Sequence, residues 1–132
     1  MGLRRYFNVA LKSDLKFLFN AQEAEFLGDQ QQDAISAAGN NSQANATQLT
    51  GTICAVTVVT AGANSIKLPL ISTFKGSYVF VANEDAADTI NCFPAVGDAI
   101  GTLGANNAMG IASLVRALFF KISSTRWLVI TV

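Results

Sequence analysis

The sequence from Leu49 to Val132 is divided into short runs of β-branched and aromatic residues, and turn-forming residues end each run. The runs cover residues 52–60, 65–70, 76–83, 89–94, 99–108, 112–123 and 126–132. Val, Ile, Thr, Phe and Tyr favour strands, whereas Gly, Asn, Asp and Pro favour turns. Short strands repeated at this interval are typical of antiparallel sandwiches and barrels. The sequence therefore predicts an all-β fold, a small antiparallel β-sandwich or barrel-like domain over residues 49–132.

One of these runs also fits a helix. The stretch "NNAMGIASLVRALFF" has apolar residues at helical spacing. Gly110, the β-branched and aromatic content, and the hairpin pattern "KISSTRWLVITV" that follows favour a strand instead. We expect strands on both sides of the tight turn "SSTR".

The chain begins differently. Leu11, Leu15, Leu18, Phe19 and Phe26 fall at helical spacing, which predicts a short amphipathic helix over residues 13–27. Ser at position 13 is a suitable N-cap and Gly at position 28 a suitable stop. An isolated helix of this length is marginal in water, so it needs a support. The support is either its own β-domain or a partner, and both remain open here.

The segment from Gly28 to Gln48 is polar, and Ile35 is its only large apolar residue. Such a composition indicates a linker without a core of its own. We therefore expect two parts: an extended N-terminal arm over residues 1–48 with one short helix, and the β-domain over residues 49–132.

The charge content limits the possible partners. Nine basic and nine acidic residues give a net charge of zero, so the electrostatic footprint of a nucleic-acid-binding protein is missing. Charged residues make up 14% of the chain, against roughly 25% in an average soluble domain. A small domain has much surface to cover, so we expect part of this surface to be buried in an assembly. The basic start of the chain, with Arg4 and Arg5, is either solvated or docks on an acidic groove.

Metal, cofactor and membrane binding find no support in the sequence. The chain has no His, and Cys54 and Cys92 stand alone in apolar runs, so we expect two buried thiols, with a disulfide left open. The longest uncharged stretch, from Asn40 to Ile66, is too polar for a transmembrane helix. We expect no metal, no cofactor and no membrane partner.

The best candidates for acid–base catalysis are four carboxylates of the β-domain: Glu84, Asp85, Asp88 and Asp98. They stand beside Asn, Ala and Gly residues, which is typical of turns. A Ca²⁺ site in "NEDAAD" is an alternative, although the segment lacks the spacing of a DxDxDG loop. We expect turns here, and a protein that is not an enzyme.

Aromatic and basic residues are interleaved near the end of the chain. Phe119, Phe120, Lys121, Arg126 and Trp127 resemble a base-stacking platform, and Arg126 with Trp127 resembles a sugar-stacking site. The β-domain has few other basic residues, so we expect no nucleic-acid partner. A Trp in such a strand is more often part of the core.

Three segments, taken in order, resemble a known family. They are Ala46 to Leu49 ("ATQL"), Ser65 to Pro69 ("SIKLP"), and Val81 to Ile100 ("VANEDAADTINCFPAVGDAI"). This order resembles the small structural domains of tailed bacteriophages found in capsid decoration (cement) proteins, head fibres and related virion proteins. The resemblance covers Ala44 to Val132. It departs from the family pattern at Gly101, where the family has Asn, and it does not cover the arm.

The resemblance implies a decoration protein that binds the major capsid protein on the outer surface of the virion and stabilises the head shell. It also implies a homo-oligomer, for which the three-fold sites of icosahedral shells suggest a trimer. The arm would then hold the capsid through residues of both kinds, apolar and basic: Leu15, Leu18, Phe19, Phe26, Arg4 and Arg5. The alternative is a head- or tail-fibre domain that binds host glycans through exposed Trp127, Tyr78 and the turn carboxylates.

Overall fold

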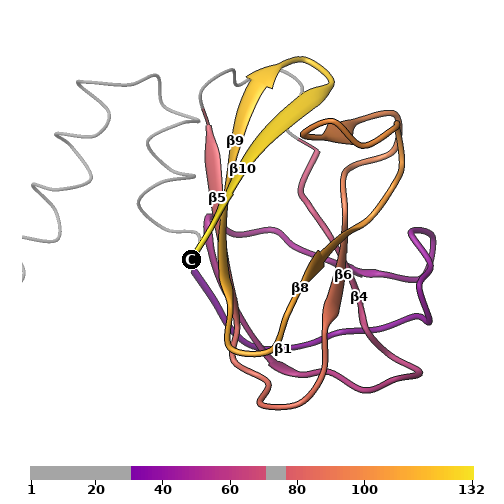
Figure 1. The fold of residues 1–132 in the computed structure, drawn as a ribbon, viewed down its shortest axis with the longest axis vertical. Helices are drawn as coiled ribbons and strands as arrows, with labels where there is room; N and C mark the ends of the chain where they lie inside the picture. Colours follow the sequence, from indigo (N-terminus) through magenta and orange to yellow (C-terminus); the bar gives the residue numbers. More distant parts are fainter. Residues whose placement is uncertain (1–30, 71–76) are drawn as a thin grey trace, which may run out of the picture. The chain divides into compact units, whose positions relative to one another are not determined.

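Ten β-strands and no helix occur in the described residues, 31–70 and 77–132, of this computed structural model (Figure 1). The predicted helix at 13–27, with Leu15, Leu18, Phe19 and Phe26, and the basic pair Arg4 and Arg5 lie outside the described residues. Residues 31–132 form one unit by their contacts, which we call the β unit.

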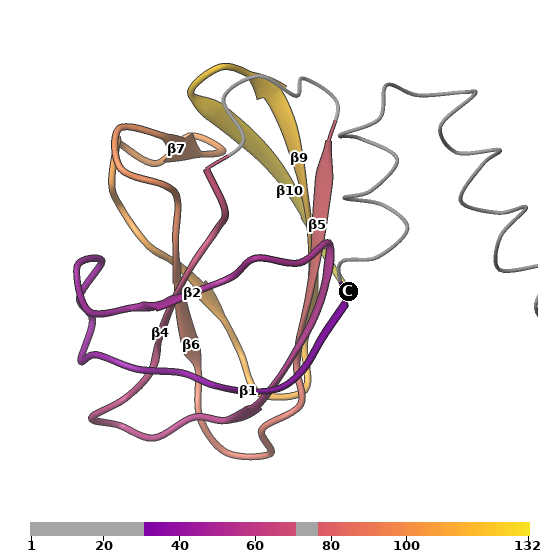
Figure 2. The same ribbon diagram turned by 180° about the vertical axis from the view of Figure 1, so that it is seen from behind.

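The strands form two sheets. Sheet A has the order β1 (Gln31–Ser36), β3 (Ile53–Val58), β5 (Tyr78–Asn83), β9 (Arg116–Ser123), β10 (Arg126–Thr131) and β7 (Ala99–Ile100). Sheet B has the order β2 (Thr47–Gln48), β4 (Ser65–Lys67), β6 (Ile90–Phe93) and β8 (Met109–Ile111). Figures 1 and 2 show the two sheets as separate layers.

The chain alternates between the two sheets, because odd-numbered strands up to β9 lie in sheet A and even-numbered strands up to β8 lie in sheet B. Consecutive turns of the chain therefore stack on each other, with β1, β3 and β5 parallel in one layer and β2, β4 and β6 parallel in the other. The arrangement is a solenoid-like stack of parallel strands. After β5 and β6 the pairing becomes antiparallel: β8 pairs with β6, β9 pairs with β5, and β10 pairs with β9.

The all-β prediction is confirmed, but the antiparallel sandwich or barrel is not, because five of the eight strand pairings are parallel. The sequence periodicity that predicts a strand does not determine its partner. Antiparallel hairpins join strands that are consecutive in the chain, whereas here each strand from β1 to β4 pairs with the strand two places further on.

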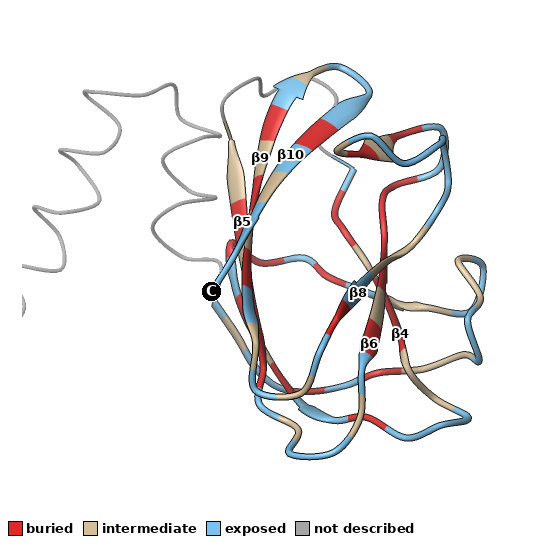
Figure 3. Ribbon diagram, viewed as in Figure 1, coloured by how far each residue is buried: buried red, intermediate tan, exposed pale blue. Residues whose placement is uncertain are grey.

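Both sheets contribute to the core, and Figure 3 shows buried positions on strands of each. Sheet A contributes Cys54, Val81 and Ala117, which lie side by side in register and are fully buried. Sheet B contributes Ile66 and Cys92, which are paired and buried in the same way. Burial of such apolar side chains stabilises the fold by about 1.5–3 kcal/mol each.

The polar segment before Leu49 is not a linker as expected. Gln31–Ser36 forms β1, which runs parallel to β3, and Ile35 is buried at 7% exposure. The Gln32 Oε1 atom accepts hydrogen bonds from the N–H groups of Thr50 and Gly51, at 2.8 and 3.0 Å, so it holds the turn between β2 and β3. The β unit thus begins at Gln31 rather than at Leu49.

The stretch that fitted both helix and strand forms β8 and β9, which confirms the strand prediction. The turn between these strands contains Leu114, which has φ of 60° and a side chain that is 55% exposed. A left-handed conformation is unfavourable for a residue with a Cβ atom. A further turn, at Gly39, has φ of 72°, and a Cβ atom there would make an unusually tight contact, 3.0 Å, with backbone atoms of Asn45.

Candidate functional site

The face of sheet A that points away from sheet B, here called the outer face, is apolar. The register places its side chains in two rows that cross the sheet. One row holds Tyr78, Phe120 and Leu128, and the other holds Ile53, Phe80, Leu118 and Ile130. Side chains that are opposite each other on one face of a sheet lie within contact distance, so the rows form a continuous surface.

The most exposed residues of the outer face lie on β10 and β3. Ile130 is 56% exposed, Ile53 44% and Leu128 43%, whereas Phe80 and Phe120 in the middle are partly covered. The charged residues of this face, Arg116 and Arg126, stand at the ends of their strands. Monomeric proteins rarely expose a contiguous apolar patch larger than a few hundred Å², and such patches mark interaction sites.

Arg116 is already paired. Its guanidinium Nη2 lies 3.1 Å from Glu84 Oε1, and both side chains are nearly half exposed. An ion pair this exposed contributes little to stability, with a typical value of about 0–1 kcal/mol. The pairing with Glu84 compensates the charge of Arg116 at this end of the outer face.

A second distinct feature is a polar cluster inside the core, formed by Asp98, Lys121 and Trp127. The Lys121 ammonium group donates a hydrogen bond to Asp98 Oδ2, and Trp127 Nε1–H donates to the same oxygen at 3.2 Å. The Lys121 Nζ atom also lies 4.9 Å from the centre of the Trp127 ring, within the range of a cation–π contact. All three residues are at most 3% exposed.

This cluster joins strands to a loop. Lys121 and Trp127 are neighbours in register on β9 and β10. Asp98 precedes β7; its N–H donates to Ala95 C=O at 2.9 Å, and its C=O accepts from Asn106 N–H at 2.8 Å. The buried carboxylate therefore ties the loop between β6 and β7 to the end of sheet A.

Burial of this cluster corrects two interpretations of the sequence. Trp127 is fully buried, so it is not an exposed platform for a glycan, and Lys121 faces the core rather than a nucleic acid. Tyr78, the other residue expected to contact a glycan, is partly covered within the outer face. The interpretation of Trp127 as a core residue is the one that the structure supports.

The segment "NEDAAD" forms a turn held by its own side chains. Asp85 Oδ1 accepts the N–H groups of Ala87 and Asp88, each at 2.9 Å. The N–H of Asp88, then that of Ala87, lowers the pKa of the Asp85 carboxyl. The buried Asn83 amide donates to three backbone carbonyls, those of Asp88, Ile111 and Ala112, at 2.9–3.0 Å. These bonds join the turn to the end of β8.

Three of the four candidate carboxylates are engaged in different places, and the fourth, Asp88, lies in the turn that Asp85 holds. Glu84 pairs with Arg116, Asp85 accepts backbone N–H groups of its turn, and Asp98 lies in the core. Within the described ranges, no group of three or more His, Cys, Asp or Glu side chains is placed to hold a metal ion. The geometry supports turns, as expected from the sequence.

Both thiols are buried and free, which confirms that expectation. Burial raises the pKa of Cys54 to about 11, although a hydrogen bond with the Gly51 backbone opposes the shift. Burial also raises the pKa of Cys92, and the nearby Cys54 adds to this effect.

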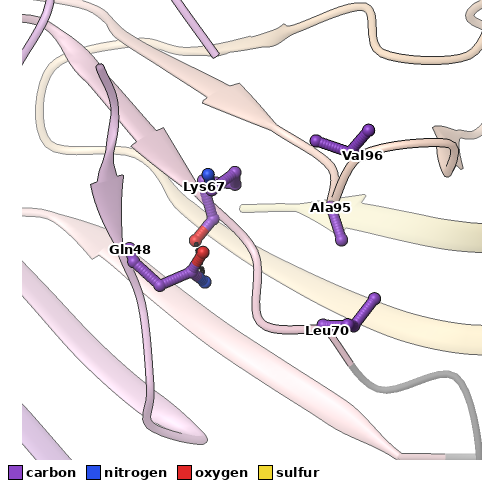
Figure 4. A pocket seen from close by; sticks show the side chains of 5 residues that line it. All are labelled: Gln48, Lys67, Leu70, Ala95 and Val96. Carbon is purple, nitrogen blue, oxygen red and sulfur yellow. Dashed lines mark hydrogen bonds between the residues drawn. The ribbon is translucent and has the colours of Figure 1, made fainter. Parts of the chain in front are cut away.

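A shallow pocket of about 220 Å³ opens beside sheet B, lined by Gln48, Lys67, Leu70, Ala95 and Val96. Figure 4 shows the Gln48 side chain directed at the Lys67 carbonyl. The Gln48 amide donates to the carbonyls of Leu49, Lys67 and Leu68, at 2.9–3.3 Å. Its hydrogen-bonding capacity is thus used within the fold, and Gln48 acts as a structural residue.

Comparison with known proteins finds no matching family model, no matching curated protein and no matching solved structure. The described part of the chain contains no helix long and apolar enough to cross a membrane. Neither the outer face nor the buried cluster was identified from the sequence. The outer face could not be identified, because it depends on the strand order. For Lys121 the sequence does contain a signal: it is two residues from Phe119 on β9, and alternation along a strand places both side chains on the same face.

Proposed function

We propose that this protein is a virion structural protein of the capsid decoration or cement type. It binds the major capsid protein on the outer surface of a bacteriophage head, stabilises the shell, and associates as a homo-oligomer, a trimer on the three-fold sites. It performs no catalytic step and uses no cofactor.

The observation that carries this proposal is the outer face of sheet A. It offers two apolar rows with charges only at its ends, in a chain with 14% charged residues. An apolar face of this kind fits a protein that functions in permanent contact with other chains. The order of the segments "ATQL", "SIKLP" and "VANEDAADTINCFPAVGDAI" supports the same class.

Attachment to the shell is assigned to the N-terminal arm, whose apolar stripe and basic residues lie outside the described part. Many copies on one shell strengthen weak individual contacts, because each bound neighbour raises the effective concentration of the next. The fibre alternative relied on an exposed Trp127. Since this residue is buried, no observation favours that alternative over decoration.

The proposal is tested with heads that lack the protein, prepared by deleting its gene in the phage that carries it. Purified full-length chain should co-sediment with these heads and raise the temperature at which they open. The variant Leu18→Asp/Phe19→Asp should lose binding, because each buried apolar side chain contributes roughly 1.5–3 kcal/mol. Absence of wild-type binding to the heads would refute the decoration role, and a few copies located at the tail would instead support recognition.

A further inference from the structure

Strand β10 combines two properties at one place in the fold. Its outward side chains, Leu128 and Ile130, are among the most exposed apolar residues of the outer face. Its far side is also open: β7 pairs only with Arg126 and Trp127, so no described strand lies beside the rest of β10. The apolar face and the free strand edge therefore coincide.

The backbone pattern shows which groups this edge presents. Arg116 and Val132 exchange both of their N–H to C=O hydrogen bonds, at 2.9 Å each. In an antiparallel pair such residues alternate with residues whose backbone groups point away from the neighbouring strand. Val129 and Thr131 thus direct their N–H and C=O groups toward the open side of β10.

The opposite edge of sheet A is different. Strand β1 carries the charged Asp33, and its pairing with β3 is interrupted by register shifts around Ala34, which has φ of 54°. Charges and bulges are the usual means by which proteins prevent edge strands from pairing with other chains. From Trp127 to Thr131, β10 has no charged residue and no Pro. Its pairing with β9 has a register shift between Arg126 and Trp127 and none after it.

We propose that copies of this chain associate through β10, with Leu128 and Ile130 of one copy packed against the same residues of its neighbours. The inference rests on the homo-oligomer of the proposed function and specifies its interface. Identical faces can meet here without opposed like charges, because the centre of the face is neutral and Arg116 is paired with Glu84. Around a three-fold axis, three copies of β10 would bury the residues that one copy leaves exposed.

The test uses Ile130→Lys and Ile130→Glu in the full-length chain, with Val58→Lys as the control. Val58 is similarly exposed, at 50%, but lies on β3, which β5 and β9 separate from β10. Sedimentation equilibrium should show an oligomer for the wild type and for Val58→Lys. Each Ile130 variant alone should approach the mass of a single chain, 13.9 kDa, with association weakened by roughly 30-fold or more.

Mixing the two Ile130 variants in equal amounts distinguishes loss of the interface from loss of the fold. If the Ile130 residues of neighbouring copies meet, a mixed trimer has Lys against Glu at two of its three contacts, so the oligomer should form again. Unfolded variants would not be rescued in this way. A monomeric wild type, Ile130 variants that keep the wild-type mass, or a mixture that stays monomeric would each overturn the inference.

Binding to heads that lack this protein separates the test of the interface from the test of the proposed function. If the Ile130 variants remain oligomeric while the wild type binds heads, the interface is wrong and the decoration role stands. If β10 mediates the oligomer but the chain does not bind heads, the interface stands and the decoration role is refuted.

Discussion

Removing the Asp98 carboxylate should cost the β unit a large part of its stability. In Asp98→Ala, the Lys121 ammonium and the Trp127 N–H both lose their acceptor while remaining in the core. Breaking a buried ion pair by removing one partner typically costs about 3–5 kcal/mol, against a total stability of about 5–15 kcal/mol for a domain. Lys121→Met should cost a similar amount, because it leaves the carboxylate with the Trp127 N–H alone.

The double variant Asp98→Ala/Lys121→Met removes both charges at once. It should therefore cost less than the sum of the two single variants, by about 2 kcal/mol or more. Trp127 is the only Trp in the chain and lies in this cluster, so its fluorescence during urea unfolding reports the stability directly.

The exposed pair Arg116–Glu84 provides the matched control. Arg116→Ala should change the free energy of unfolding by less than about 1 kcal/mol, because water screens the pair. The reasoning would be refuted if Asp98→Ala cost no more than this control, or if the effects of Asp98→Ala and Lys121→Met were additive.

Three further predictions follow from single contacts. Asn83→Leu should lower the free energy of unfolding by about 2–4 kcal/mol in urea titrations, because it leaves three carbonyls without their donor. Leu114→Gly should raise stability by about 0.5–1 kcal/mol, measured by thermal melting, because it relieves a left-handed conformation at an exposed site. At pH 8 the Cys54 and Cys92 thiols of the folded chain should react more slowly with a disulfide reagent than those of the urea-unfolded chain, because burial raises both pKa values.

The pH dependence of folding should include a contribution from Asp85, whose pKa is lowered in the fold by backbone N–H groups. Its stabilising effect is complete above the unfolded pKa of about 3.9 and is lost as the pH falls toward the lower folded value. Asp85→Asn should remove this part of the acid dependence while changing stability little at neutral pH, since the Asn Oδ1 can still accept the same bonds. Melting curves between neutral and acidic pH check this, and an unchanged acid dependence would contradict it.

The sequence located the strands well where the residues are strongly β-forming. Runs 52–60, 76–83 and 126–132 correspond to β3, β5 and β10. Strand β1 was missed because a strand at a sheet edge needs few apolar residues; Ile35 alone marks its buried side within a polar segment. The local composition resembles a linker, and only the pairing with β3 reveals a strand.

The strand order and the buried polar groups could not be obtained from the sequence in the same way. Periodicity shows which face of a strand is buried, but not which strands are neighbours. The outer face depends on β5, β9 and β10 lying side by side, which no local pattern encodes. No local pattern predicts that Lys121 is buried, because charged side chains are rarely buried without a partner, and the partner, Asp98, lies in a distant loop.

The position of β9 has a consequence for the order in which the protein can be made. Sheet A is complete only when β9 inserts between β5 and β10, and both β9 and β10 come later in the chain than β1, β3 and β5. A ribosome delivers residues in chain order, so the emerging chain has β1, β3 and β5 before it has the strand that joins them to β10. Folding of sheet A therefore waits for the β9–β10 hairpin, and a chain terminated before β9 cannot form the interface proposed on β10.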